Sequence, residues 1–119
     1  MLQEDLTITP MPIEREGVRV IKLDGPLTLK SVFEFQDVLR AETSPAVILD
    51  FSTVPYVDSA GIGSIVRAHV SCCNQNRRLL LVGLADRVVT ILRVSKVEGV
   101  LVRFPTLKEA MASIQSRAS

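Results

Sequence analysis

The stretch "VILDFSTVPYVDSAGIGSIV" (Val47–Val66) decides the fold, because it joins a buried strand to the start of a helix. The stretch begins inside the apolar run "AVILDF" (Ala46–Phe51), which starts one residue earlier and follows a Ser44-Pro45 break. Such a continuous run is typical of a central strand that is covered on both faces. The motif "VDSAGIGSI" (Val57–Ile65) then places an aspartate, a serine and two glycines before a helical pattern. This order predicts a strand, a loop and a helix.

Apolar residues after the motif recur at steps of three and four, which indicates an amphipathic helix of about four turns. The expected buried stripe consists of Ile62, Ile65, Val66, His69, Val70 and Cys73.

Two strands are predicted before this unit, because Leu6–Glu14 and Gly17–Gly25 alternate between apolar and polar residues. The turn Arg15–Gly17 joins them. Proline cannot donate a hydrogen bond to a central ladder. Pro10 and Pro12 therefore predict that the first strand is short or lies at an edge of the sheet.

The remaining elements also alternate between strand and helix. A helix is expected over Leu29–Ala41, with a stripe of Leu29, Val32, Phe33, Gln36 and Leu39, and with Phe35 and Val38 beside it. Later come a buried strand, Arg77–Gly83, and a helix over Leu84–Ser95 marked by Leu84, Val88, Ile91 and Leu92. A further strand, Gly99–Phe104, precedes a last helix marked by Leu107, Ala110, Met111 and Ile114.

This alternation predicts one α/β domain over residues 1–119. Strands that alternate with helices form a parallel sheet with right-handed crossovers. We therefore expect a mixed β-sheet, with an N-terminal hairpin and then parallel strands, covered by about four helices.

Composition excludes several classes of function. The chain has 119 residues, of which 47% are hydrophobic, and its 14 Lys and Arg nearly balance 13 Asp and Glu. This charge gives no support for binding nucleic acid through its phosphates. Aromatic residues make up 4% and tryptophan is absent, which disfavours stacking on single strands.

A cytoplasmic location without membrane contact is expected from three features. The start "MLQEDLTITP" (Met1–Pro10) carries acids where a secretory signal has basic residues. No apolar stretch approaches the roughly 18 residues that a membrane-spanning helix needs. The adjacent Cys72 and Cys73 fit reduced thiols better than a disulfide framework.

The motif has several interpretations, of which an ordinary helix start is the simplest. Asp58 or Ser59 would cap the helix by accepting a hydrogen bond from a free backbone N–H. A serine hydrolase is disfavoured, because the only histidine, His69, lies roughly 15 Å further along the same helix. A phosphate-cradling loop is conceivable at a helix N-terminus, but "DSAGIG" lacks the Walker lysine.

A metal site is also disfavoured. His69, Cys72 and Cys73 could bring one thiol beside the imidazole, but adjacent cysteines point about 100° apart on a helix, and zinc wants about four ligands. We expect core or partly buried surface at these residues, and no metal or other cofactor. The last interpretation is that Ser59 accepts a phosphate, which adds roughly −1.5 to −2 charge at a helix end that can tolerate it.

The chain resembles a stand-alone STAS domain of the anti-sigma factor antagonist type over nearly its whole length. The specific part is Val47–Val66, where the family shows an apolar strand and then Asp-Ser-(Ser/Thr/Ala)-Gly-(aliphatic)-Gly opening a helix. The order of elements over Leu79–Met111 also matches. The resemblance implies a STAS-type fold.

The resemblance also implies a function, in which this chain is a protein substrate and not an enzyme. In such family members the serine after the aspartate, here Ser59, is phosphorylated by an anti-sigma factor that is also a kinase. The unphosphorylated protein binds the anti-sigma factor and frees the sigma factor, and a phosphatase resets the switch. A bacterial source is implied, and a weak homodimer remains an option.

The chain departs from the family before the expected helix. Family members often carry Gly-(Glu/Asp)-(Leu/Phe)-Asp after the second strand, with the last acid close to the serine. Here the run is "GPLT" (Gly25–Thr28), so Pro26 and Thr28 replace acids. Ala60 leaves Ser59 as the only phosphoacceptor inside the motif.

A partner surface is expected at the start of the motif helix, the loop from Thr53 to Asp58 and the exposed side of the Leu84–Ser95 helix, where Val89 and Val94 fall outside the apolar stripe. Packing in the core is the alternative for these valines. Asp58 would orient the loop, and Gly61 and Gly63 would permit close approach by a partner or by the sheet. The predicted contact residues are Thr28, Thr53, Tyr56, Asp58, Ser59, Ala60, Gly61, Ile62, Gly63 and Val89.

Two other functions stay open. One is a STAS scaffold without phosphorylation, within a transporter or a signalling complex, which the loss of an acid at Thr28 favours. The other is a small nucleotide- or lipid-binding module that uses the N-terminus of the motif helix.

Overall fold

A five-stranded sheet in the order β1-β2-β3-β4-β5 is the frame of the computed structural model, which describes residues 5–12 and 15–114. The strands are β1 (Thr7–Met11), β2 (Val18–Asp24), β3 (Ala46–Thr53), β4 (Arg78–Val82) and β5 (Val102–Phe104). The helices of the described residues are α1 (Val32–Ala41), α2 (Ser59–Asn74), α3 (Asp86–Val94) and α4 (Leu107–Ser113). The predicted mixed sheet with an N-terminal hairpin and about four helices is confirmed.

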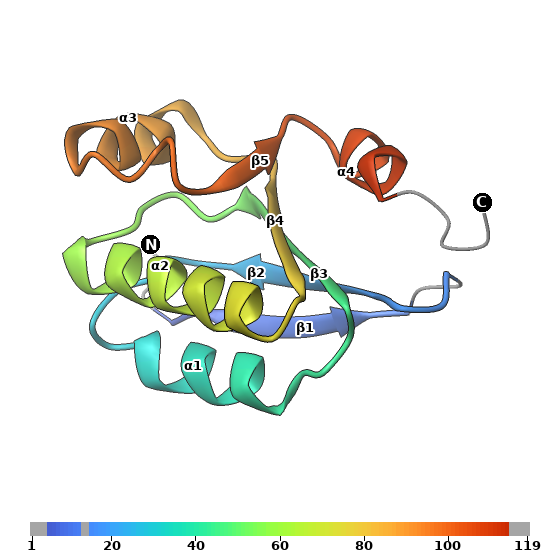
Figure 1. The fold of residues 1–119 in the computed structure, drawn as a ribbon. Helices are drawn as coiled ribbons and strands as arrows, with labels where there is room; N and C mark the ends of the chain where they lie inside the picture. The colour runs from blue at the N-terminus through green and yellow to red at the C-terminus, as the bar shows by residue number, and fades with distance from the viewer. Residues whose placement is uncertain (1–4, 13–14, 115–119) are drawn as a thin grey trace.

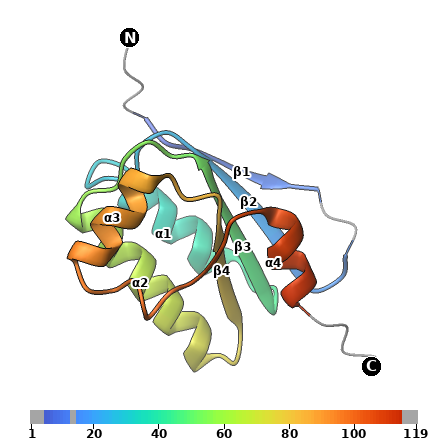
Figure 2. The ribbon, with the colours of Figure 1, turned by 90° about the horizontal axis from the view of Figure 1, so that it is seen from above.

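The topology explains where the helices lie. β1 is antiparallel to β2, whereas β2, β3, β4 and β5 are parallel to one another. Each crossover advances in the same direction across the sheet, and right-handed crossovers of this kind place their helices on one face. Figure 2 shows α1, α2 and α3 on one side of the sheet and α4 on the other, and Figure 1 shows the same chain from the side.

Alternating side chains of the central strand fill two cores. Val47, Leu49 and Phe51 of β3 belong to the larger core, with residues of α1, α2 and α3. Ala46 and Ile48 point the other way, into a smaller core with Ala110 of α4. Both faces of β3 are thus covered, as its apolar run predicts.

The first strand is short and lies at the edge of the sheet, as its prolines predict. Pro10 lies inside β1 opposite Ile21, and Pro12 follows the strand directly. The predicted strand extended to Glu14, but Ile13 and Glu14 lie outside the described residues.

The predicted start and stripe of the first helix were wrong in part. α1 begins at Val32, not at Leu29, and its buried residues are Val32 and Phe35. Leu29 and Phe33 were expected in the stripe, yet they are 63% and 68% exposed. The later start follows a turn before α1, in which the Ser31 hydroxyl accepts from the Thr28 N–H at 3.0 Å and donates to the Pro26 carbonyl at 3.1 Å.

The motif helix, α2, has the predicted length of about four turns, but its buried face is rotated from the predicted stripe. Ile62 and Ile65 are buried as expected. Cys72 is buried and Cys73 exposed, the reverse of the predicted stripe, and Val70 is also exposed. The helix turns about 100° per residue, so a small change of phase exchanges adjacent positions.

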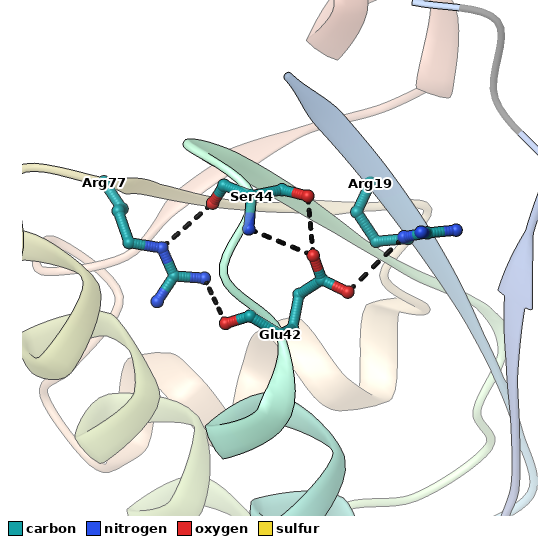
Figure 3. A network of polar contacts seen from close by, with 4 residues as sticks. All are labelled: Arg19, Glu42, Ser44 and Arg77. Atoms are coloured by element: carbon teal, nitrogen blue, oxygen red, sulfur yellow. Dashed lines mark hydrogen bonds and ion pairs between the residues drawn. The ribbon is translucent and has the colours of Figure 1, made fainter. Parts of the chain in front are cut away.

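A network of polar contacts holds the amino ends of the parallel strands (Figure 3). The Arg77 guanidinium, before β4, donates to the carbonyls of Ser44 and Glu42 at 2.9 and 2.8 Å. The Glu42 carboxylate accepts from the Ser44 N–H and hydroxyl at 3.0 and 2.6 Å, and pairs with Arg19 of β2 at 3.4 Å. The connection between α1 and β3 is thereby fixed to both neighbouring strands.

This network also sets the protonation of Glu42. Burial acts to raise the pKa of its carboxyl, but the hydrogen bonds from Ser44 and the charges of Arg19 and Arg77 outweigh it. The pKa of Glu42 is therefore lowered from its ordinary value.

Candidate functional site

The start of α2 is built around Asp58, which caps the helix. Its Oδ1 accepts from the Gly61 N–H at 2.8 Å, whereas Oδ2 accepts from the Leu29 N–H at 3.1 Å. Of the two residues predicted as the N-cap, Asp58 is therefore the one that caps α2, and Ser59 is the first residue of the helix. One carboxylate ties the helix start to the loop before α1.

Backbone contacts hold the same two loops together at the carboxyl ends of β2 and β3. The Leu27 N–H donates to the Tyr56 carbonyl at 3.0 Å, and the Asp58 N–H donates to the Leu27 carbonyl at 3.3 Å. Thr28 is thus brought beside the motif. The Thr28 hydroxyl accepts from the Lys30 N–H at 3.3 Å, which is a hydrogen bond within its own loop.

Gly61 permits this close approach of the two loops. A Cβ at Gly61 would lie 2.3 Å from the Leu27 carbonyl oxygen and 2.7 Å from Val57 Cγ1. Gly63 differs, because no atom lies within 4 Å of its Cβ position. The prediction that another segment of this chain packs closely against the glycine is confirmed for Gly61 and wrong for Gly63. Close approach of a partner protein at Gly63 stays a prediction.

The other predicted contact residues differ in exposure. Ser59, Thr53 and Tyr56 are exposed, and the Thr53 hydroxyl donates to the Leu23 carbonyl at 2.9 Å. Ala60 and Gly63 are half-buried. Gly61 is buried and Ile62 is only 6% exposed, so their side of the helix faces the core.

The third helix, α3, lies at the same end of the molecule as the start of α2, as Figures 1 and 2 both show. Val94 is 75% exposed, in agreement with its place outside the predicted stripe. Val89 is half-buried and lines a hollow with Asp86, Arg93 and Phe104. Whether either valine contacts a partner stays a prediction.

Leu29 and Phe33 are the surface residues that sequence reasoning missed. The two exposed residues are four positions apart in the chain. The Leu29 N–H donates to the Asp58 carboxylate, so Leu29 lies beside the motif. A signal existed in the sequence, because Val32, Phe35 and Leu39 already complete a stripe at helical spacing. Leu29 and Phe33 are then apolar residues outside that stripe, and both are exposed.

The histidine and cysteines lie away from the Ser59 turn along α2. Burial raises the pKa of the Cys72 thiol. The exposed Cys73 Sγ lies 3.5 Å from His69 Nε2. Among the described residues, no group of three or more His, Cys, Asp or Glu side chains is placed to hold a metal ion.

Comparison with known proteins identifies the family. The STAS domain family model matches residues 9–110. A Thermotoga maritima structure, named as that of a candidate anti-sigma factor antagonist, has a TM-score of 0.83 and 18% identity over 92% of this chain and 95% of that chain. The resemblance and the STAS-type fold inferred from the sequence are confirmed.

Three further structures, of two proteins, show the range of proteins that share the fold. The anti-sigma factor antagonist SpoIIAA of Bacillus is similar in its unphosphorylated form (TM-score 0.72, 19% identity) and in its phosphorylated form (0.69, 16%), each covering 92% of this chain and 100% of that chain. A sulfate transporter family protein from Wolinella succinogenes has a TM-score of 0.74 and 26% identity over 86% of this chain and 88% of that chain. No helix in the described part of this chain is long and apolar enough to cross a bilayer.

Proposed function

The chain belongs to the STAS domain family, and on this premise we propose that it is an anti-sigma factor antagonist switched by phosphorylation of Ser59. Its partner is an anti-sigma factor with serine kinase activity. The unphosphorylated chain binds that partner and frees a sigma factor, and the phosphorylated chain releases it. ATP belongs to the kinase, and a phosphatase restores the binding form.

The accessible hydroxyl at the start of α2 is the observation that carries this proposal. Ser59 is exposed, whereas both oxygens of the neighbouring Asp58 are occupied by backbone N–H groups. The capping of the helix therefore does not require the serine hydroxyl. A kinase can modify Ser59 without removing a contact that holds the fold.

The charge of a phosphate gives the switch its direction. It adds roughly −1.5 to −2 charge at a helix N-terminus, where the helix dipole favours an anion. The same charge lies close to the Asp58 carboxylate and to the exposed Leu29 side chain. A partner with an acidic or apolar surface over this turn would be repelled, while the fold remains. The similarity of this chain to both forms of SpoIIAA supports a fold that tolerates the modification.

The rest of the proposal follows from this role. Residues 1–119 act as a single STAS domain in the cytoplasm of a bacterium, by binding and not by catalysis. The partner covers the turn at Ser59, the loop from Thr53 to Asp58 and the exposed side of α3. Leu29 and Phe33 extend this surface on the side of α1.

Intact mass of the protein from its native cells tests the switch. We expect one added phosphate in the wild type, its removal by phosphatase, and its absence from Ser59→Ala. Ser52→Ala is the matched control, because Ser52 is also exposed and precedes the motif, and it should keep the phosphate. A phosphate that persists in Ser59→Ala, or one lost from Ser52→Ala, would assign the modification to another residue.

A scaffold module of a transporter or signalling complex is the second candidate. The 26% identity to a sulfate transporter family protein favours it, as does Thr28 in place of a family acid. On this alternative, no phosphate is found under any growth condition, and neither Ser59→Ala nor Ser59→Asp alters the exchange of partners in native cells.

A further inference from the structure

A cavity of about 170 Å³ opens between α1 and α2, further along α2 than the Ser59 turn. Its wall is mostly apolar. Phe35 comes from α1, Val47 from β3 and Leu79 from β4, and all three are buried. The remaining lining residues are Gln36, Leu39, Arg40, Ser64, Arg67, Ala68, Ser71, Cys72 and Arg77.

The size of the cavity limits its occupant to a small molecule. An apolar cavity of about 150 Å³ in another protein holds one benzene molecule. The space between α1 and α2 therefore suits an apolar group of about six carbon atoms. Cys72 contributes to the apolar wall, since burial raises the pKa of its thiol and keeps it neutral.

Three arginines surround this apolar space, and none of the described acidic residues lines it. Arg40 is paired with Asp37 at 2.8 Å, so its charge is largely offset. Arg67 has no ion pair within the part of the chain that the structure describes. The lining therefore carries an excess of positive charge that an anion would complement.

Arg77 is held in a fixed orientation at the edge of the cavity. Its Nε and Nη2 donate to the carbonyls of Ser44 and Glu42, and its Nη1 donates to Gln75 Oε1 at 2.7 Å (Figure 3 shows the first two). A guanidinium has five N–H donors, so two are left after these three bonds. Glu42 offsets part of its charge, but Arg19 pairs with the same carboxylate. Arg77 is therefore a preorganised cation with donors to spare.

We propose that this cavity binds a small amphipathic carboxylate. The apolar end lies against Phe35 and Leu79, and the carboxylate is held at the mouth by Arg67 and the free donors of Arg77. Guanidinium groups bind carboxylates in this way through paired N–H donors. The site is separate from the Ser59 switch, because the lining begins at Ser64 on α2.

Titration of the whole chain with hexanoate, followed by NMR amide shifts, tests this site. Hexanoate provides a short apolar tail and one carboxylate. We expect saturable shifts along the facing surfaces of α1 and α2 at millimolar concentrations or below. Shifts elsewhere, or no saturation up to about 20 mM, would overturn the inference.

The charge contribution is tested with Arg67→Gln. Arg87→Gln on α3 is the matched control, because it removes the same charge from an exposed position outside the cavity lining. We expect about threefold weaker hexanoate binding for Arg67→Gln and no change for Arg87→Gln, since exposed ion pairs are worth well under a factor of ten. Binding of neutral 1-hexanol should be the same in all three proteins. An equal effect of both substitutions on hexanoate would leave only general charge attraction and overturn the assignment.

The cavity itself is tested with Ala68→Leu, which fills it from α2. Ala112→Leu adds the same atoms at an exposed position of α4 and controls for the added surface. With both variants folded by circular dichroism, we expect at least tenfold weaker hexanoate binding in Ala68→Leu alone. Unchanged binding in Ala68→Leu would place the ligand elsewhere.

Discussion

The two ends of the parallel sheet use polar groups in opposite ways. At the amino ends, Arg77, Glu42 and Ser44 bond to one another and to nearby carbonyls (Figure 3). At the carboxyl ends, Asp58 holds two loops together, yet the adjacent Ser59 remains exposed.

At one end of the sheet the polar groups bond within the chain, whereas at the other end one polar group stays exposed to solvent. The amino-end network mainly joins segments of the chain to each other. Only two N–H donors of Arg77 are left without a partner in it. The carboxyl-end turn is also held by hydrogen bonds, but it presents a hydroxyl and nearby apolar side chains to solvent. In open α/β sheets, ligands and partners generally meet the carboxyl ends of the strands. A firm frame around an accessible group is what a switch at Ser59 requires.

The largest expected effect comes from the closest contact at the carboxyl end. Gly61→Ala would place a Cβ 2.3 Å from the Leu27 carbonyl oxygen. We expect a loss of about 2–3 kcal/mol in the free energy of unfolding, measured by urea denaturation, because the backbone of the facing loop must move. Gly63→Ala is the control. Its Cβ meets no atom within 4 Å, so the higher helix propensity of alanine should stabilise the chain by up to about 1 kcal/mol. Equal effects at both glycines would contradict the close approach of the two loops.

Removal of the cap should have the next largest effect. Asp58→Ala leaves the N–H groups of Gly61 and Leu29 without their acceptor, and we expect a loss of about 1–2 kcal/mol in urea denaturation. Asp58→Asn should lose less, because an amide oxygen still caps the helix. Thr106→Ala removes the cap of the short helix α4, an exposed contact at 3.2 Å, and should cost about 0.5 kcal/mol. A larger loss for Thr106→Ala than for Asp58→Ala would show that Asp58 does not hold the two loops.

Local patterns in the sequence predict much of the frame that these substitutions perturb. The apolar run Ala46–Phe51 predicts a strand buried on both faces, and Pro10 predicts the edge strand, because each depends on short-range chemistry. Residue type and position also predicted a cap at Asp58 or Ser59 and a close approach at Gly61 or Gly63, and the structure selects Asp58 and Gly61. The family motif brought Thr28 into consideration, and hydrogen bonds of its neighbours Leu27 and Leu29 hold its loop against the motif.

The features that were missed depend on contacts between distant parts of the chain. Leu29 and Phe33 matched a helical stripe, but the Ser31 turn leaves Leu29 outside α1, and the helix buries Val32 and Phe35 instead of Phe33. The choice between Cys72 and Cys73 depends on how α2 is rotated against the sheet. The Arg77 network joins residues 33 and 35 positions apart, and no local pattern indicates that pairing.

The amino-end network should show its contribution as a dependence on pH. The lowered pKa of Glu42 means that its ionised form is favoured in the folded state. Its stabilising effect is therefore fully present above the unfolded pKa, about 4.3 for glutamate, and is lost as the pH falls through the folded pKa. Glu42→Gln should be less stable than the wild type by roughly 1 kcal/mol at pH 7, with the difference shrinking below about pH 4.

Urea denaturation between pH 3 and pH 7 measures this difference. Glu34→Gln is the control, because Glu34 is an exposed glutamate in the first turn of α1, the helix that Glu42 follows. It should change the stability by a few tenths of a kcal/mol at most. A Glu42→Gln difference that stays constant from pH 7 to pH 3 would mean that the charge of Glu42 does not support the network.

The smallest expected effect on stability belongs to the residue proposed as the switch. Ser59 is exposed, and Asp58 already caps α2, so Ser59→Ala and Ser59→Asp should each stay within about 0.5 kcal/mol of the wild type. Their effects on function should differ: Ser59→Ala keeps the partner, whereas Ser59→Asp weakens its capture because of the added charge. Urea denaturation and partner capture from native cells measure the two properties separately. A loss above about 1 kcal/mol in Ser59→Ala would give the hydroxyl a structural role like that of Ser44, and the contrast between the two ends of the sheet would fail.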